Sequence, residues 1–283
     1  MKIQQLLQQA RAALDVRGLA TPRLDAELLL AFSIDRERHF LYAHPAKELS
    51  GVELKRFRSL VERRIKGEPI AYITGRKEFW SLDFEVTPDV LIPRPDTEIL
   101  IEEILKFSGQ EREKKIRILE IGTGSGVISI ALAFELENAF ITATDFSPKA
   151  LSIAMRNAVN NNMEEKISFL CGDIFEPVKD KFDIIVSNPP YISEDEFRLL
   201  APEVREYEPR QALVAGPEGT EFHRKLACDG ERFLEKNGWL VMELGAGQRF
   251  AIEKILKDKD YCDITFRSDY AGIERVAMAK KRG

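Results

Sequence analysis

The chain has 283 residues, of which 44% are hydrophobic and 31% charged, and its formal net charge is −5 at pH 7. This composition is typical of a globular protein long enough for two domains. The charge argues against a protein that wraps long duplex DNA, because such binding needs many contacts between basic side chains and phosphates.

The three cysteines (Cys171, Cys228 and Cys262) are scattered, without the spacing of a metal site or a disulfide framework. The first residues lack the apolar core of a signal peptide, and no apolar run approaches the ~20 residues of a membrane span. We therefore expect a cytoplasmic protein with no metal site and no membrane partner.

Residues 1–75 are predicted to form a small helical bundle. Thr21 and Pro22 are typical of an N-cap followed by proline at the first helical position, and Ser50 with Glu53 forms a capping-box signature. This part carries 13 Lys and Arg against 9 Asp and Glu, so it is basic. Its densest basic segment, 55–66, is either a solvated helix face or a patch for nucleic acid or an RNA-bound partner.

Residues 76–98 are predicted to link two domains. The segment 78–86 alternates like a strand, and 89–92 is expected to pair with it as a hairpin. Two prolines then stiffen the turn at 92–98, where Asp96 or Thr97 can cap a helix that runs to about residue 107.

Residues 99–283 are predicted to form an α/β domain. Strand patterns at 116–121, 140–144, 167–171, 182–187 and 239–244 alternate with helical patterns at 126–134, 148–160, 219–235 and 248–257. A polar, acidic loop is expected at 194–208. The last two strand patterns, 263–267 and 274–279, have no helix between them. We therefore predict a doubly wound, mostly parallel seven-stranded sheet with an antiparallel last strand.

A glycine-rich turn after the first of these strands predicts a nucleotide-like ligand lying against the backbone. The pattern is G-x-G-x-G, and Val127 stands where the dinucleotide fingerprint G-x-G-x-x-G needs its last glycine. Acidic residues stand at the ends of the first three strands. Glu120 precedes the glycines, and Asp145, after the second strand, can accept hydrogen bonds from ribose hydroxyls. Asp173, after the third strand, can face an adenine edge, with Ile174 and Phe175 as apolar walls. Carboxylates favour a cationic, phosphate-free nucleoside such as S-adenosylmethionine over NAD. The predicted cofactor site comprises Gly122, Thr123, Gly124, Ser125, Gly126, Asp145, Asp173, Ile174 and Asn188.

The tetrapeptide Asn-Pro-Pro-Tyr at 188–191, directly after the fourth strand, indicates the chemistry. Prolines have no N–H group, so their backbone offers only carbonyl acceptors, and the asparagine side chain adds another. A rim of acceptors beside an aromatic ring suits a planar –NH2 group. Asn-Pro and Pro-Pro dipeptides are, however, also common in ordinary turns that follow a strand. The predicted catalytic residues are Asn188, Pro189, Pro190 and Tyr191.

The motifs together resemble the HemK/PrmC family of class I S-adenosylmethionine-dependent methyltransferases, which methylate the N5 atom of glutamine in peptide chain release factors. The resemblance spans essentially the whole chain and is carried by the segments 92–98, 121–126, 187–192, 208–213 and 238–248.

The resemblance implies that the substrate is the side-chain amide of the glutamine in the Gly-Gly-Gln motif of class I release factors. Asn188 and the Pro189 carbonyl would then hold the amide nitrogen, with Tyr191 and Pro190 packed on the amide plane. The helical domain, 1–75, would dock this protein, and no stable nucleic-acid partner is expected.

Two alternatives stay open at this point. One is a DNA or RNA amino-methyltransferase acting on adenine N6 or guanine N2, because the same acceptors would hold an exocyclic amine. The other is a non-catalytic adaptor that binds S-adenosylmethionine.

Overall fold

The computed structural model describes residues 1–108 and 115–282, so part of the predicted third segment, 99–283, lies outside the described residues. The chain divides into two compact units. The first comprises Met1–Arg76 with Ala201–Tyr207, and the second comprises Lys77–Leu200 with Glu208–Gly283. The sequence prediction did not include residues 201–207 in the first unit.

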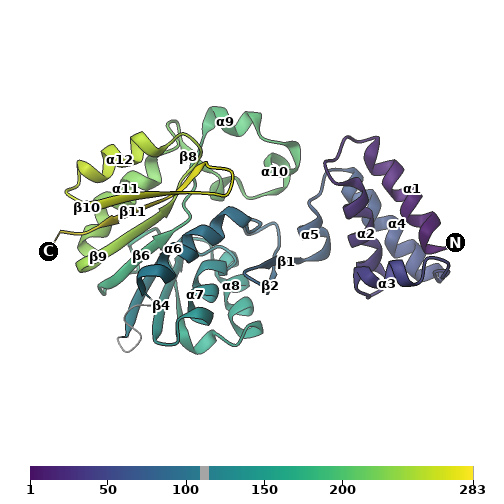
Figure 1. Ribbon diagram of the computed structural model, residues 1–283, viewed down its shortest axis with the longest axis horizontal. Helices are drawn as coiled ribbons and strands as arrows, with labels where there is room; N and C mark the ends of the chain where they lie inside the picture. The colour runs from purple at the N-terminus through teal and green to yellow at the C-terminus, as the bar shows by residue number, and fades with distance from the viewer. Residues whose placement is uncertain (109–114, 283) are drawn as a thin grey trace. The chain divides into compact units, whose positions relative to one another are not determined.

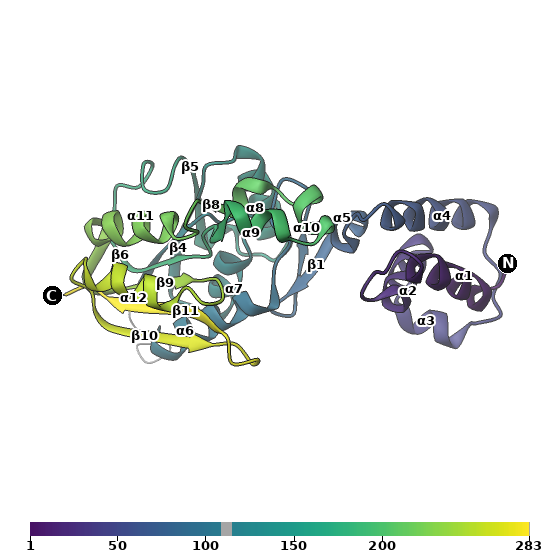
Figure 2. The same ribbon diagram turned by 90° about the horizontal axis from the view of Figure 1, so that it is seen from above.

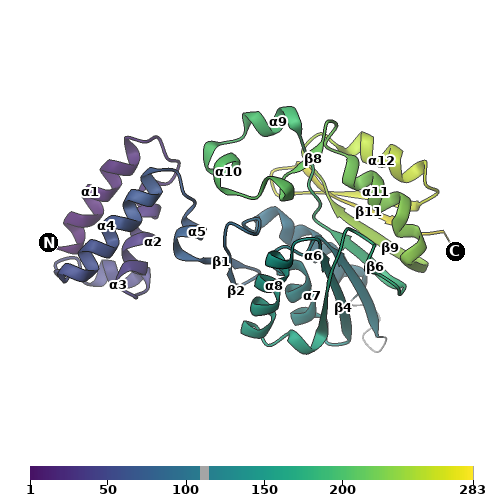
Figure 3. The ribbon, with the colours of Figure 1, turned by 180° about the vertical axis from the view of Figure 1, so that it is seen from behind.

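The first unit is helical, as Figure 3 shows for α1 to α5. Apolar side chains from α1 to α5 form its core. Thr21 precedes a helix that begins with Pro22, and the capping box between Ser50 and Glu53 is present, so both predicted helix starts are confirmed. The helices are α1 (Ile3–Asp15), α2 (Pro22–Ser33), α3 (Arg38–Ala43), α4 (Gly51–Ile65), α5 (Ile70–Thr74) and α10 (Pro202–Tyr207).

A buried arginine on α4 connects α2 with α10 in this unit. The Arg64 Nε atom lies 2.7 Å from Asp25 Oδ2, and its Nη1 atom lies 2.8 Å from Glu203 Oε2 in α10. Because a buried charge needs a partner, Glu203 compensates the charge of Arg64 and links 201–207 to the bundle. Part of the basic segment 55–66 is therefore structural, whereas Lys55 and Arg58 on the same helix are exposed.

The predicted hairpin has a different register. Strands β1 (Arg76–Phe79) and β2 (Leu82–Glu85) pair with each other, and Trp80 and Ser81 turn between them with φ angles of 54° and 56°. The expected pairing of 78–86 with 89–92 is wrong. Carboxylates stabilise the observed turn, because Glu98 accepts from the Trp80 N–H at 2.9 Å and Glu78 from the Ser81 N–H at 3.1 Å.

The second unit contains the predicted sheet, which confirms the fold class. Within the described residues seven strands form it in the order β10-β11-β9-β6-β3-β4-β5, and β11 runs antiparallel to both of its neighbours. The other pairings are parallel. The strands are β3 (Ile116–Ile121), β4 (Ala139–Asp145), β5 (Ile167–Cys171), β6 (Phe182–Ser187), β9 (Leu234–Glu243), β10 (Cys262–Ser268) and β11 (Glu274–Lys280).

Helices cover both faces of this sheet, as its near-continuous apolar strands require (Figures 1 and 2). On β3, Ile118 packs in the cluster with α6 (Glu98–Ser108), α7 (Val127–Glu135) and α8 (Pro148–Asn160). Its neighbour Leu119 packs in the opposite cluster with α11 (Glu221–Gly230) and α12 (Arg249–Lys257).

The segment after β6 is more ordered than predicted. The expected loop at 194–208 contains α9 (Glu194–Leu199) and α10, so that prediction is wrong. The signal for α9 was present, because Ser193 and Glu196 form a capping box. The remaining elements are η1 (Pro95–Thr97), η2 (Glu164–Lys166), β7 (Ile192–Ser193), η3 (Arg210–Ala212), β8 (Val214–Gly216) and η4 (Glu231–Phe233).

Candidate functional site

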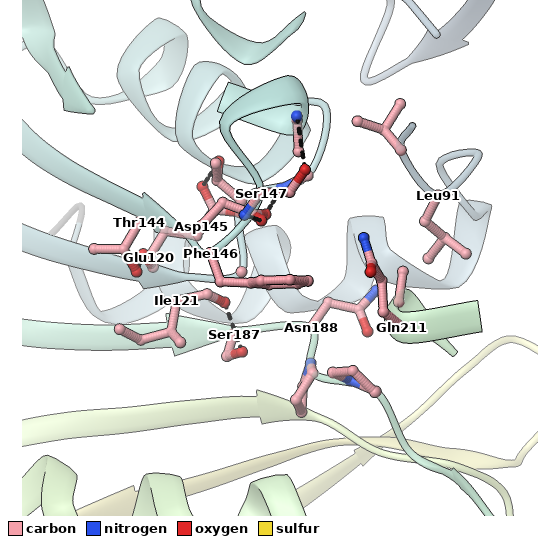
Figure 4. A pocket seen from close by; sticks show the side chains of 18 of the residues that line it. Leu91, Glu120, Ile121, Thr144, Asp145, Phe146, Ser147, Ser187, Asn188 and Gln211 are labelled. Carbon is pink, nitrogen blue, oxygen red and sulfur yellow. Dashed lines mark hydrogen bonds between the residues drawn. The ribbon is translucent and has the colours of Figure 1, made fainter. Parts of the chain in front are cut away.

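A cavity of about 370 Å³ in the second unit opens where β3, β4 and β6 end. This is the position where ligands bind in doubly wound sheets, at the strand where the order of connection reverses. Figure 4 shows side chains from these strand ends turned into it. All predicted site residues except Gly126 and Tyr191 line the cavity, namely Gly122, Thr123, Gly124, Ser125, Asp145, Asp173, Ile174, Asn188, Pro189 and Pro190.

The glycines of the turn have two different roles. Gly122 and Gly124 have φ angles of 74° and 56°, and no atom lies within 4 Å of where their Cβ atoms would be. They therefore leave room for a ligand close to the backbone. Gly126 is packed, because its Cβ would lie 3.2 Å from the Ala154 Cβ on α8.

Asp145 faces the cavity at the end of β4 and is held by the backbone. Its Oδ2 accepts from the Gly124 N–H and its Oδ1 from the Ser147 N–H, both at 2.9 Å. Burial raises the pKa of Asp145, and these hydrogen bonds oppose the shift. Each oxygen retains a second lone pair, so the carboxylate can still accept from a ligand.

Glu120 lines the cavity, and one of its two carboxylate oxygens accepts three hydrogen bonds from the protein. Its Oε2 accepts from the Thr123 hydroxyl at 2.7 Å, from the Ser129 N–H at 3.1 Å and from the Ser129 hydroxyl. Burial raises the pKa of Glu120 to about 7. Near neutral pH it therefore contributes less negative charge to the site than the sequence suggested.

The turn after β5 is strained where it borders the cavity. Ile174 has a φ angle of 47°, which is rare for a β-branched residue and typical of functional sites. Asp173 beside it is exposed and lines the cavity. Phe175, predicted as a second apolar wall, is not among the lining residues and stacks on Phe233 in the core, with 4.9 Å between the ring centroids.

Phe146 was not predicted as a site residue. Its side chain is 54% exposed, and its ring projects into the cavity between Asp145 and Asn188 (Figure 4). A large exposed aromatic side chain in a cavity offers a flat surface for stacking. The only signal in the sequence was its position, directly after the acidic residue that ends a strand.

Asn188 follows β6 and belongs to a buried chain of hydrogen bonds. Its Nδ2 donates to Thr97 Oγ1 at 3.1 Å, and the Thr97 hydroxyl donates to Glu243 Oε2 at 2.7 Å. Thr97 comes from the proline-rich turn and Glu243 from the end of β9. In the predicted capping role Thr97 would bond the helix backbone, but its hydroxyl is engaged in this chain instead, and η1 has no side-chain cap.

Tyr191 is not among the residues that line the cavity. Its hydroxyl is 3.4 Å from Glu243 Oε1, and its carbonyl oxygen accepts from Gln248 Nε2 at 2.8 Å. The predicted contact between its ring and a substrate stays a prediction. Gln248 thus connects the 238–248 segment of the resemblance to the tetrapeptide.

Burial raises the pKa of Glu243 to about 7, although Thr97, Tyr191 and the charge of Arg275 oppose the shift. Burial and the neighbouring carboxylate raise the pKa of Tyr191. The backbone carbonyl of Glu243 also contacts His223 Nε2 at 2.8 Å, and burial lowers the pKa of this histidine to about 4. His223 is therefore neutral beside Glu243 at physiological pH.

Two further segments of the resemblance meet at the cavity. Arg94 lines it, and its Nη2 lies 2.5 Å from Glu208 Oε1, while Glu208 Oε2 accepts from the Ile92 N–H at 3.1 Å. The guanidinium is thus paired with a carboxylate, which leaves it poorly suited to neutralising a phosphate.

Among the described residues no group of three or more His, Cys, Asp or Glu side chains is placed to hold a metal ion. Within the same part of the chain no helix combines the length and apolar character of a membrane span.

Comparison with known proteins gives the family. Residues 5–75 match the PrmC N-terminal domain, and residues 95–203 match the methyltransferase small domain. A release factor glutamine methyltransferase of Geobacter sulfurreducens is 41% identical over 275 residues, covering 97% of this chain and 95% of that protein. One from Aliivibrio fischeri is 39% identical over 282 residues, covering 99% and 98%.

A solved methyltransferase from Pyrococcus furiosus has the same fold, with a TM-score of 0.53 and 22% identity over 78% of this chain and 98% of that one. The full-length matches at about 40% identity settle the relationship, and the chain belongs to the release factor glutamine methyltransferase family.

Proposed function

We propose that this protein transfers a methyl group from S-adenosylmethionine to the side-chain amide nitrogen of the glutamine in the Gly-Gly-Gln motif of class I peptide chain release factors. The observation that carries the proposal is that Asn188, Pro189 and Pro190 line the same cavity as the glycine turn and Asp145. Acceptors for an –NH2 group and a site for a nucleoside therefore share one space.

The cavity fits this methyl donor better than a phosphate-containing cofactor. Asp145 is oriented by two backbone N–H groups and can accept from a ribose, while Phe146 offers a flat face for an adenine ring. The lining arginine, Arg94, is paired with Glu208. The open faces of Gly122 and Gly124 allow close approach to the backbone.

The bound donor supplies a methyl group already activated for transfer. The protein's task is to position a weak nucleophile, because the amide nitrogen shares its lone pair with its carbonyl group. Asn188 Oδ1 and the Pro189 carbonyl oxygen are the acceptors that would hold the two amide hydrogens. Holding both favours a pyramidal nitrogen whose lone pair faces the donor. Orientation of the reacting groups as a whole can supply up to ~7–11 kcal/mol.

The helical unit is proposed to dock the release factor. It contains Lys55 and Arg58, both exposed on α4, and it includes 201–207, which belong to the same stretch of chain that leaves the tetrapeptide at residue 192.

The test is methylation of a purified release factor by the purified protein with labelled methyl donor. The expected result is one methyl group on the glutamine of the Gly-Gly-Gln motif, located by mass spectrometry. A release factor in which that glutamine is replaced by glutamate serves as the control and should stay unlabelled.

Parallel reactions with naked RNA and DNA separate the alternatives. Label on nucleic acid without label on the release factor would favour an amino-methyltransferase acting on bases. Absence of transfer to every substrate, with intact binding of the donor, would favour a non-catalytic adaptor.

A further inference from the structure

We propose that Thr97 is a positioning residue that, together with Glu243, fixes which end of the Asn188 amide faces the substrate. The inference rests on the proposed function, in which Asn188 accepts a hydrogen from the substrate amide. It gives a role to the proline-rich turn at 92–98, whose stiffness the catalytic proposal leaves unused.

An asparagine side chain has two chemically opposite ends of nearly equal size. One end accepts hydrogen bonds and the other donates them, and a rotation by 180° exchanges them. If the Asn188 NH2 group faced the substrate, two donors would oppose each other and the amide would be repelled. The active site therefore needs a device that selects one of the two orientations.

The observed hydrogen bonds provide that device. When Glu243 is ionised its carboxylate can only accept, so the Thr97 hydroxyl gives its single hydrogen to Glu243 Oε2, at 2.7 Å. The Thr97 oxygen is then left as an acceptor, and Asn188 must turn its Nδ2 toward it, at 3.1 Å. Among the described residues no hydrogen bond to Asn188 Oδ1 is found, so this oxygen is left for a ligand.

The fold makes the device rigid. Thr97 and Glu243 are both buried, and Thr97 sits in η1, whose first residue is Pro95. Its N–H bonds to the Arg94 carbonyl at 3.1 Å. Proline fixes φ and so stiffens the backbone that carries Thr97, while burial and the bond to Glu243 hold its hydroxyl in place. The stiff turn thus helps to fix the orientation of the Asn188 amide, although Asn188 lies 91 positions away in the sequence.

The protonation state of Glu243 decides whether the device works. A protonated carboxyl group can donate to Thr97, which frees the threonine hydrogen to bond Asn188 Oδ1 and reverses the amide. The groups that face Glu243 are the Thr97 and Tyr191 hydroxyls, the charges of Arg275 and Asp96, and the His223 ring at its backbone carbonyl. His223 stays neutral above about pH 4, so it does not titrate in the same range.

The first test compares Thr97→Val, which keeps the shape and removes the hydroxyl, with Thr97→Ser, which keeps the hydroxyl. We expect Thr97→Val to lower kcat roughly 30- to 100-fold with KM changed less than about threefold, because misorientation costs rate more than binding. Thr97→Ser should stay within about threefold of the parent protein. Ser108→Ala, which removes another buried hydroxyl from the end of α6, is the matched control and should leave kcat unchanged.

The second test needs neither substrate nor donor. The side-chain amide signal of Asn188 is assigned by NMR from its loss in Asn188→Ala, and exchange of its hydrogens with water is measured. Slow exchange in the parent protein and Thr97→Ser, with faster exchange in Thr97→Val, supports the inference even if the release factor proves not to be the substrate. Equal exchange in all three proteins contradicts it even if Thr97→Val unfolds more easily.

The third test is the pH profile of kcat. The folded-state pKa of Glu243 is raised, so the ionised, orienting form is lost as the pH falls through about 7. We expect kcat to fall over that range in the parent protein, and the step should vanish in Glu243→Gln but persist in Glu120→Gln. A step that survives in Glu243→Gln, or unchanged kcat in Thr97→Val, would overturn the assignment.

Discussion

Two buried glutamates support different parts of the cavity and are built in different ways. Glu120 finds its partners at Thr123 and Ser129, within nine residues of itself. Glu243 finds its partners at Thr97 and Tyr191, which lie 146 and 52 residues away. Burial raises the pKa of both to about 7.

The comparison separates a local construction from a long-range one. At the glycine end of the cavity, Glu120 is satisfied by the turn and the helix that directly follow its own strand, β3. The wall of the cavity that carries Asn188 is built differently. There Asn188 and Glu243, from two distant parts of the chain, both bond the hydroxyl of Thr97, which comes from a third. We therefore expect damage to the wall to affect catalysis, and damage to the glycine end to affect binding and stability.

The largest effect is expected for Asn188→Ala. Loss of the side-chain acceptor should lower kcat roughly 100- to 1000-fold, as for other residues that hold a reacting group in place. The affinity for S-adenosylmethionine, measured by calorimetry, should stay within about threefold. Asn160→Ala on the exposed end of α8 is the matched control. Turnover within about tenfold of the parent protein would remove Asn188 from its proposed role.

The same contrast explains how much of the structure the sequence could predict. The sheet, its antiparallel last strand and the cavity-lining glycines were predictable, because alternating patterns and turn residues act over a few neighbours. The Thr97 chain was not, because no local pattern indicates a contact between residues 97 and 243. The hairpin register failed for a related reason: of the two carboxylates that stabilise the turn at Trp80 and Ser81, Glu98 lies 18 residues from Trp80.

Asp145→Ala tests the local end of the cavity. A carboxylate that accepts from neutral hydroxyls is worth about 1.5–3 kcal/mol, so we expect the affinity for S-adenosylmethionine to fall roughly 10- to 100-fold. Loss of the bond to the Gly124 N–H would also loosen the glycine turn. Calorimetry gives the affinity, and Asp180→Ala, at an exposed position, is the control. Unchanged affinity would place the donor elsewhere.

Glu120→Gln tests the pKa of the local glutamate through stability. A pKa raised from 4.5 to about 7 means that Glu120 contributes most to stability below about pH 4.5 and loses that contribution as the pH rises through about 7. The amide oxygen of Gln can replace the single bonded oxygen, Oε2, without becoming charged. We therefore expect the variant to be stabilised relative to the parent by on the order of 1–2 kcal/mol at pH 8, with a smaller difference at pH 5.

Denaturant unfolding at several pH values measures this difference. Glu243 remains in the variant and keeps part of the pH dependence, so the slope should decrease without vanishing. A slope identical to that of the parent protein would show that Glu120 does not titrate in this range.

The smallest effect is expected for Phe146→Ala, and it bears on the flat face that the cavity offers to a nucleoside. Aromatic stacking is worth about 0.5–1.5 kcal/mol beyond burial, so the affinity for S-adenosylmethionine should fall roughly 3- to 10-fold while kcat at saturation stays nearly constant. Phe134→Ala is a close control, because that side chain on α7 is 52% exposed against 54% for Phe146 but lies outside the cavity. If both variants lost affinity equally, the effect would be one of general stability. If only Phe146→Ala lost affinity, the exposed Phe146 ring would contact the bound S-adenosylmethionine. The glycine end of the cavity would then include one more local residue, directly beside Asp145.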